Sequence, residues 1–167
     1  MNRKETTLFL GSLLKRDKFS GRGKYWASEV TLDYGTKDVK RVDFMQFEPV
    51  NQYGISGLEK GIFICYEVKS CKADFNSGFG QNFIAEKNYL VMPMKTYKEV
   101  INDIPQSVGV LCPIPIGRDK YTEFEDPTAI NGSTSYWTLQ TIRAARQRER
   151  KRAMTELLFC MLRSGKG

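Results

Sequence analysis

The segment that most restricts the fold is residues 61–69, which read Gly-Ile-Phe-Ile-Cys-Tyr-Glu-Val-Lys. The apolar part of this run is rich in β-branched and aromatic side chains, which favour a strand. It does not alternate with polar residues, so we expect a strand that is covered on both faces and lies inside a layered sheet. The run nevertheless ends in Glu67 and Lys69, which stand two residues apart and therefore leave the same face of a strand.

The remaining segments predict a mixed α/β domain. Leucines near helical spacing in residues 4–15 indicate a first helix, and short helices are expected around residues 73–75 and 96–101. The expected strands are residues 26–33, 39–48, 61–69, 88–93 and 108–113. A chain of 167 residues has the length of one ordinary domain. We therefore predict a single domain over residues 1–167, with a mixed central sheet flanked by helices.

The strand at residues 26–33 is predicted from alternation, and a turn at residues 34–38 joins it to residues 39–48 as a hairpin. Alternation assigns one set of side chains to each face of the strand. The first set is Trp26, Ser28, Val30 and Leu32, and the second is Ala27, Glu29, Thr31 and Asp33.

The last stretch, residues 134–163, is predicted to be a long helix that packs on the domain or extends from it. Apolar residues fit helical periodicity at both of its ends. Between them, residues 143–152 hold six Arg or Lys and one Glu, so this segment supplies +5 (six minus one) of the net charge of +7. Such a density of cations suits an anionic polymer, although a solvated helix face is the alternative.

We therefore expect the basic part of this helix to bind nucleic acid through phosphates and without sequence specificity. The residues assigned to this contact are Arg143, Arg146, Arg150 and Lys151. The apolar residues of the same helix could instead form a homodimer or bind a partner protein. Those residues are Met154, Leu157, Leu158 and Met161.

Histidine is absent from the chain. Catalysis by Ser-His-Asp or Cys-His and zinc sites with histidine ligands are thus excluded, which leaves carboxylates, Lys, Tyr and Cys for any chemistry. The apolar stretch at residues 8–14 is too short for a signal sequence, and no run approaches the roughly 20 apolar residues of a membrane span. We expect a cytoplasmic protein with free thiols and no membrane partner.

The strongest chemical feature combines Asp43, on the second predicted strand, with Glu67 and Lys69. If Asp43 lies on the neighbouring strand and faces the same way, two carboxylates and an ammonium converge at one edge of the sheet. Two such carboxylates suit Mg²⁺ or Mn²⁺, with water and a substrate phosphate as the other ligands, and this arrangement supports hydrolysis of a phosphodiester. A structural salt bridge from Glu67 to Lys69 or Arg41 is the alternative.

Three segments carry a resemblance to a known family. They are Arg41-Val-Asp-Phe-Met45, Tyr66-Glu-Val-Lys-Ser-Cys-Lys-Ala-Asp-Phe75 and Asn88-Tyr-Leu-Val-Met-Pro93. Their order resembles the PD-(D/E)XK nuclease superfamily, and more narrowly its MmcB-type DNA-repair branch and related phage-encoded proteins. The resemblance spans most of residues 1–113 and implies a restriction-endonuclease-like core, a mixed four-stranded sheet flanked by helices.

The resemblance implies Asp43 and Glu67 as metal ligands and Lys69 as the catalytic lysine. An additional acidic residue of the superfamily would correspond to Glu5 or to Glu29. For Glu29, a salt bridge on the face of the strand is the preferred interpretation. Asp74 is expected to cap the helix that follows it. Where related proteins often have a His, this chain has Gln81, which could donate an amide hydrogen bond to a substrate.

Two functions follow as expectations. The first is a Mg²⁺-dependent nuclease that cleaves DNA in repair or in phage DNA processing, in the host cytoplasm if the chain is phage-encoded. The second is a DNA-binding protein that retains the nuclease fold and cuts little or not at all. A third reading, an interaction protein whose charged strand end is only a salt bridge, has less support from the residues.

Overall fold

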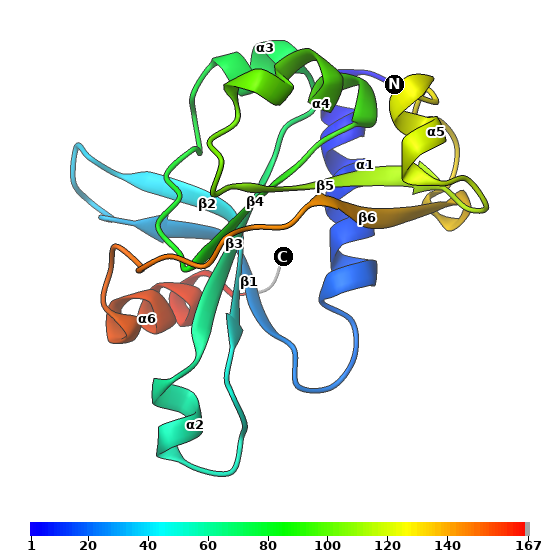
Figure 1. The fold of residues 1–167 in the computed structure, drawn as a ribbon. Helices are drawn as coiled ribbons and strands as arrows, with labels where there is room; N and C mark the ends of the chain where they lie inside the picture. Colours follow the sequence, from blue (N-terminus) through cyan, green and yellow to red (C-terminus); the bar gives the residue numbers. More distant parts are fainter. Residues whose placement is uncertain (166–167) are drawn as a thin grey trace.

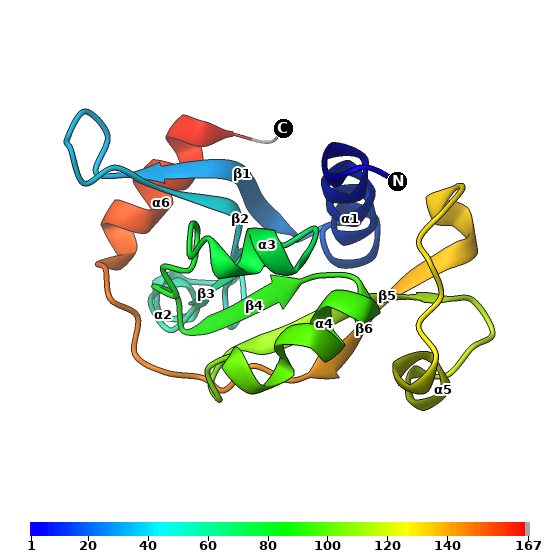
Figure 2. The same ribbon diagram turned by 90° about the horizontal axis from the view of Figure 1, so that it is seen from above.

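A computed structural model describes residues 1–165 of the protein. One six-stranded sheet in the order β1-β2-β3-β4-β5-β6 forms its centre, with helices on both faces (Figures 1 and 2). Strands β1 to β3 are antiparallel, β3 to β5 are parallel, and β6 returns antiparallel to β5. The predicted mixed α/β architecture is thereby confirmed.

The elements agree with the sequence over most of the first 115 residues. The strands are β1 (Tyr25–Leu32), β2 (Lys40–Glu48), β3 (Ile62–Val68), β4 (Lys87–Val91), β5 (Gly109–Pro115) and β6 (Trp137–Arg143). The helices are α1 (Arg3–Lys18), α2 (Ile55–Glu59), α3 (Lys72–Asn76), α4 (Met94–Val100), α5 (Lys120–Glu125) and α6 (Met154–Ser164), with 3-10 turns η1 (Ile101–Asp103) and η2 (Thr134–Tyr136). The first helix and the five predicted strands are all present, and the polar loops that contain α2 and α5 were not predicted to be helical.

Strand β3 lies third in the sheet and is buried along most of its length, as its apolar sequence predicts. On one face, α1 packs Leu10 and Leu13 against Tyr66 and Val68 of β3. On the other face, Cys65 of β3 lies in a cluster shared with α6, and β4 and β5 pack against α4. The helices therefore exclude water from both faces of the central strands.

The alternation predicted for β1 is wrong beyond Ser28. Trp26 packs in the cluster on the α1 face, whereas Ala27, Val30 and Leu32 all belong to the cluster on the α6 face. The change of face occurs at Glu29, whose φ of 51° is left-handed. The pairing with β2 is interrupted here, since neither Glu29 nor Asp43 is paired between Ser28–Phe44 and Val30–Val42, although the register does not shift.

The predicted helix over residues 134–163 is also wrong in its first two thirds. Residues 137–143 form β6, which pairs with β5 and buries Trp137 and Leu139 at a strand spacing of two. The helix α6 begins only at Met154. Arg143 is the last residue of β6, and the basic residues after it form an extended connection between β6 and α6 (Figure 1). An open edge at β5 and the mutual repulsion of six cations on one helix both favour this outcome.

The extended basic connection is attached to the amino-terminal ends of the parallel strands. Its backbone N–H groups donate to carbonyl oxygens in the segments that lead into β4 and β5. These bonds run from Arg146 to Ser107 at 3.0 Å, from Arg148 to Glu86 at 2.9 Å and from Lys151 to Ile84 at 2.9 Å. Its side chains add ion pairs from Arg150 to Glu86 and from Arg152 to Asp33, at 2.6 and 2.7 Å.

The apolar face of helix α6 packs against the sheet of the same chain. Leu157 and Met161 are buried in the cluster they share with β1, and Met154 and Leu158 pack at its margin. These four residues are the ones that were predicted from the sequence to form a homodimer or to bind a partner protein. That contact stays a prediction. Within residues 1–165, no helix has the length and apolar character needed to cross a membrane.

The two neighbours Arg150 and Lys151 test whether the basic connection stabilises the fold. In Arg150→Ala the buried Glu86 carboxylate loses a charged hydrogen-bond partner, so we expect the free energy of unfolding to fall by about 2 kcal/mol. In Lys151→Ala an exposed side chain is removed, and the change should stay within about 0.5 kcal/mol. Urea denaturation at constant m-value measures both, and equal effects would contradict the structural role of Arg150.

Candidate active site

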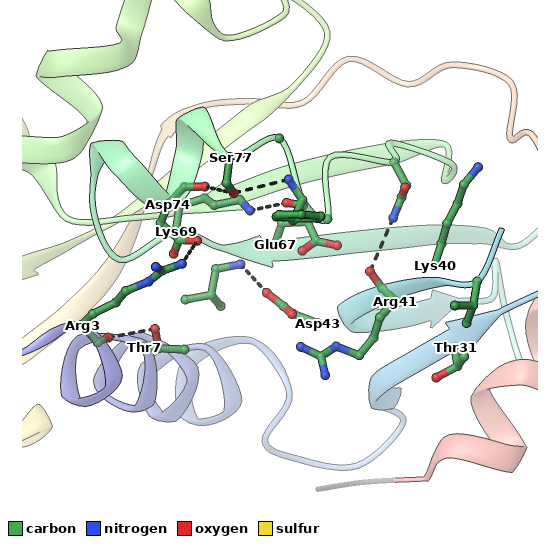
Figure 3. A pocket seen from close by; sticks show the side chains of 16 residues that line it. Arg3, Thr7, Thr31, Lys40, Arg41, Asp43, Glu67, Lys69, Asp74 and Ser77 are labelled. Atoms are coloured by element: carbon green, nitrogen blue, oxygen red, sulfur yellow. Dashed lines mark hydrogen bonds and ion pairs between the residues drawn. The ribbon is translucent and has the colours of Figure 1, made fainter. Parts of the chain in front are cut away.

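Asp43, Glu67 and Lys69 line one cleft at the carboxyl end of β3. The cleft has a volume of about 810 Å³. Figure 3 shows the three side chains directed toward this cleft from β2 and from the end of β3. The cleft is bounded by the start of α1, the β1–β2 hairpin and the loop after α3. Its other lining residues are Arg3, Thr7, Thr31, Val39, Lys40, Arg41, Val68, Asp74, Ser77, Gly78, Phe79, Gly80 and Asn82.

Asp43 lies where β2 and β3 separate. The regular pairing of the two strands runs from Glu48–Ile62 to Phe44–Tyr66 and stops there. One residue further, the carboxylate of Asp43 accepts a hydrogen bond of 2.9 Å from the backbone N–H of Val68. This side-chain bond satisfies a backbone donor that the strand ladder leaves open, and it holds the Asp43 carboxylate beside Glu67.

Glu67 carries a buried and incompletely satisfied carboxyl group. The residue is only 4% exposed, and its Oε1 atom has no hydrogen-bond partner among residues 1–165. The pKa of the Glu67 carboxyl is raised to about 10, chiefly by burial and next by the nearby negative charge of Asp43, while Lys69 acts in the opposite direction. A positive charge placed between the two carboxylates would favour their charged forms and would therefore lower the pKa of Glu67.

Gly80 provides the space that the Glu67 carboxyl occupies. A Cβ atom at this position would lie 2.4 Å from Oε2 of Glu67. The backbone of Gly80 also has φ of 76°, in the left-handed region that favours glycine. Both observations make Gly80 part of the site, although the sequence analysis gave the glycines of this loop no role.

Lys69 continues the line of β3 and is 3% exposed. Its backbone N–H donates to the carbonyl of Val91 at 2.9 Å, which keeps it in strand geometry beside β4. Its ammonium donates to the carbonyl oxygen of Phe79, in the loop that also contains Gly80. An ammonium has three N–H donors, so this bond fixes the side chain and leaves donors for another ligand.

Asp74 acts on the turn that follows β3. One of its oxygens accepts from the N–H of Ser70 at 2.9 Å and from the Ser70 hydroxyl at 3.0 Å, and the other pairs with Arg3 of α1 at 2.7 Å. The predicted cap is wrong, because α3 begins at Lys72, before Asp74, and its N-cap residue Cys71 makes no side-chain cap bond; Asp74 lies in the first turn and binds Ser70 ahead of the helix. Gln81 donates to the carbonyl of Phe75 at 2.7 Å and is not among the residues that line the cleft.

The two candidates for an additional acidic residue lie in different places. Glu5 forms a capping box with Asn2 at the start of α1, with bonds of 2.8 and 2.9 Å, and it is not part of the cleft. Glu29 is exposed and pairs with Arg41 at 3.8 Å, which agrees with the preferred salt-bridge reading. It lines a smaller cleft of about 390 Å³ that shares Asp43 with the main one.

The cations assigned to nucleic acid do not lie beside the carboxylates. The basic connection crosses the amino-terminal ends of β4 and β5, whereas the cleft is at the carboxyl end of β3. Arg143 donates to the carbonyls of Val108 and Pro105, and Arg150 binds Glu86. Arg146 and Lys151 are exposed, so a phosphate contact by these two residues stays a prediction.

A different set of cations borders the cleft, namely Arg3, Lys40 and Arg41. Arg3 and Lys40 were not predicted from the sequence to bind an anion. They come from the start of α1 and from the hairpin, where no local pattern indicates the site. Arg41 was noticed only through its spacing to Asp43. The pairing of β1 with β2 and the contact of α1 with the sheet bring them together.

The donors of the cleft fit a hard divalent cation with few protein ligands. Within residues 1–165 no group of three or more His, Cys, Asp and Glu side chains is placed to hold a metal ion. Mg²⁺ commonly binds through one or two carboxylates and keeps several waters. The unpartnered oxygen of Glu67 and the adjacent carboxylate of Asp43 supply that pair.

No protein-family model and no curated protein sequence matches this chain. A solved structure, the SPO1766 protein of unknown function from Silicibacter pomeroyi, has a similar fold, with a TM-score of 0.55 and 17% sequence identity. The match covers 95% of this chain and 82% of that chain. At this identity the likeness concerns the fold alone.

The buried carboxyl of Glu67 predicts how stability depends on pH. Its pKa is about 10 in the folded protein and 4.5 ordinarily, so the folded state binds more protons than the unfolded state between these values and stability falls as pH rises. In EDTA, Glu67→Gln should remove this dependence. Its stability relative to the unsubstituted protein should then grow by up to about 1.4 kcal/mol per pH unit between pH 6 and pH 9.

Urea denaturation over that pH range measures the effect. The control is Glu59→Gln, which changes an exposed carboxyl on α2 outside the cleft. A constant offset between Glu67→Gln and the unsubstituted protein at all pH values would contradict the prediction.

Proposed function

We propose that this protein is a nuclease-like protein that hydrolyses phosphodiester bonds of DNA with the help of Mg²⁺ or Mn²⁺. The observation that carries the proposal is the meeting of the Asp43 and Glu67 carboxylates with the Lys69 ammonium in one cleft. A helix, an antiparallel hairpin that carries the Asp, a buried strand ending in Glu-x-Lys and a parallel strand follow one another in the chain. This order supports placing the core in the PD-(D/E)XK superfamily.

Asp43 and Glu67 would hold the cation. When bound, a divalent cation polarises a phosphoryl oxygen and lowers the pKa of water. The hydrogen bond from Val68 holds the Asp43 carboxylate in place before substrate arrives, which is the condition for effective electrostatic catalysis. Gly80 leaves the space that the Glu67 carboxyl occupies, and binding of the cation would displace the proton of this carboxyl, since its pKa is about 10.

Lys69 would stabilise negative charge on the reacting phosphate. Its ammonium sits in a largely buried site, where a charge acts more strongly than in water. The carbonyl of Phe79 holds one donor, and the remaining donors are available to a phosphate oxygen or to the attacking water. Removing one such donor typically slows a reaction by about 10²- to 10³-fold.

The cations at the margin of the cleft support an anionic substrate. Lys40 and Arg41 lie on β2 beside Asp43, and Arg3 approaches from α1. They place positive charge at the margin of the cleft, although Arg3 also pairs with Asp74 and Arg41 with Glu29, and such charge attracts a phosphate backbone. Contacts of this kind position DNA without reading its sequence.

A second candidate is a DNA-binding protein that keeps this fold and does little or no cutting. Its specific support is that Glu5, one candidate for the additional acidic residue, serves as a helix cap, while Glu29 is exposed and paired with Arg41. Since Asp74 is bound to Ser70 and Arg3, only the Asp43 and Glu67 carboxylates of the cleft are left for a cation, and Lys69 is already engaged by a carbonyl oxygen. Both candidates predict salt-sensitive DNA binding.

A cleavage assay separates the candidates. Labelled single-stranded, duplex and branched DNA are incubated with the protein in Mg²⁺, Mn²⁺ or EDTA. We expect cleavage only with metal, and a loss of about 10²- to 10³-fold in Lys69→Met, which keeps the length of the buried side chain. Lys72→Met, an exposed lysine on α3 that does not line the cleft, is the matched control and should cleave normally.

Metal titration by calorimetry adds an independent readout. Asp43→Asn retains an oxygen for the Val68 bond and removes the charge, so Mn²⁺ binding should weaken while the fold persists. Metal binding and DNA binding without cleavage would support the second candidate. Unchanged Mn²⁺ affinity in Asp43→Asn would contradict the metal site and leave the cluster as a structural salt-bridge site.

A further inference from the structure

Phe79 is a large apolar side chain left in solvent beside charged groups. It lines the main cleft and is 80% exposed. Single exposed apolar residues are common on protein surfaces, so exposure alone has little meaning. The position of Phe79 is more informative, because its own carbonyl holds the ammonium of Lys69.

The loop that carries Phe79 is held on both sides. Gly78 and Gly80 flank it with φ values of 72° and 76°, so the backbone turns sharply before and after the aromatic residue. The Gly78 N–H donates to the Phe75 carbonyl at 3.2 Å, and the Gln81 side chain donates to the same carbonyl at 2.7 Å. These bonds attach the loop to α3 and reduce the entropy lost when a ligand packs on the ring.

We propose that Phe79 is a stacking site for an unpaired nucleobase next to the phosphate held in the cleft. The inference rests on the proposed function, since it takes the cleft to hold a DNA phosphate, and it specifies the substrate as single-stranded or locally unpaired. In a duplex the faces of the bases are covered by their neighbours, whereas an unpaired base offers a free face to an aromatic ring.

The composition of the cleft favours a nucleotide over other occupants. Arg3, Lys40 and Arg41 offer positive charge to a phosphate, and Phe79 offers one apolar face to a planar ring. A purely apolar ligand would make no use of these cations, and inorganic phosphate would not use the ring. A nucleotide contains both chemical parts within one residue.

The test uses a single-stranded DNA oligonucleotide that carries the fluorescent base 2-aminopurine, in EDTA so that no cutting occurs. Stacking quenches this fluorophore, so we expect quenching on binding and its loss in Phe79→Ala. The dissociation constant should rise by about 5- to 150-fold, the range for loss of one stacked base. Phe79→Trp, which keeps an aromatic face, should restore both quenching and affinity.

Phe159→Ala is the matched control, since Phe159 is 59% exposed on α6 and does not line the cleft. It should bind and quench as the unsubstituted protein does. The factor lost in Phe79→Ala should persist at higher salt, because stacking is not a charge interaction, whereas the factor lost in Arg41→Ala should shrink.

The outcomes distinguish this inference from the proposed function. Quenching that depends on Phe79, without cleavage when metal is added, supports the stacking site and overturns the nuclease. Metal-dependent cleavage with quenching unchanged in Phe79→Ala supports the nuclease and overturns the stacking site. Absence of binding to the single strand, or equal loss for fully paired duplex in Phe79→Ala, also overturns it.

Discussion

The rest of the molecule depends on the burial of a charged strand end. Strand β3 is covered on both faces, and it stays buried through Glu67 and Lys69. Burying such groups without partners costs several kcal/mol each, so the surrounding segments are arranged to meet them. The Asp43 carboxylate replaces a strand partner for Val68, and the loop at Phe79 turns so that its carbonyl reaches the lysine.

The two ends of the parallel strands consequently have different properties. At the amino-terminal ends, the extended basic connection closes the sheet, and several of its arginines are bound to carbonyls or to carboxylates such as Glu86. At the carboxyl end of β3, the strands separate and a cleft remains, with an unpartnered carboxyl oxygen inside. The densest positive charge in the sequence therefore serves the fold in large part, while a few dispersed cations border the cleft.

The central part of the site could be predicted from sequence because it follows from strand geometry. The side chains of Glu67 and Lys69 lie on the same face because side chains alternate along a strand with a period of two. Asp43 lies on β2, the antiparallel neighbour of β3. The remaining lining could not be predicted in this way. Arg3, Phe79 and Gly80 reach the cleft from a helix start and a loop, and no local periodicity relates these segments to β3.

The sequence alone determined the apolar central strand, the first helix, the five strands up to residue 115 and the charged pair at the end of β3, because each is encoded in local periodicity and side-chain type. Only the tertiary structure decided the conformation of residues 134–153. Their apolar residues fit either a helical or an extended spacing over so short a length, and pairing with the open edge of β5 selected the strand. The left-handed Glu29 and the loop around Phe79 were decided likewise, since their conformations depend on contacts with residues distant in the chain.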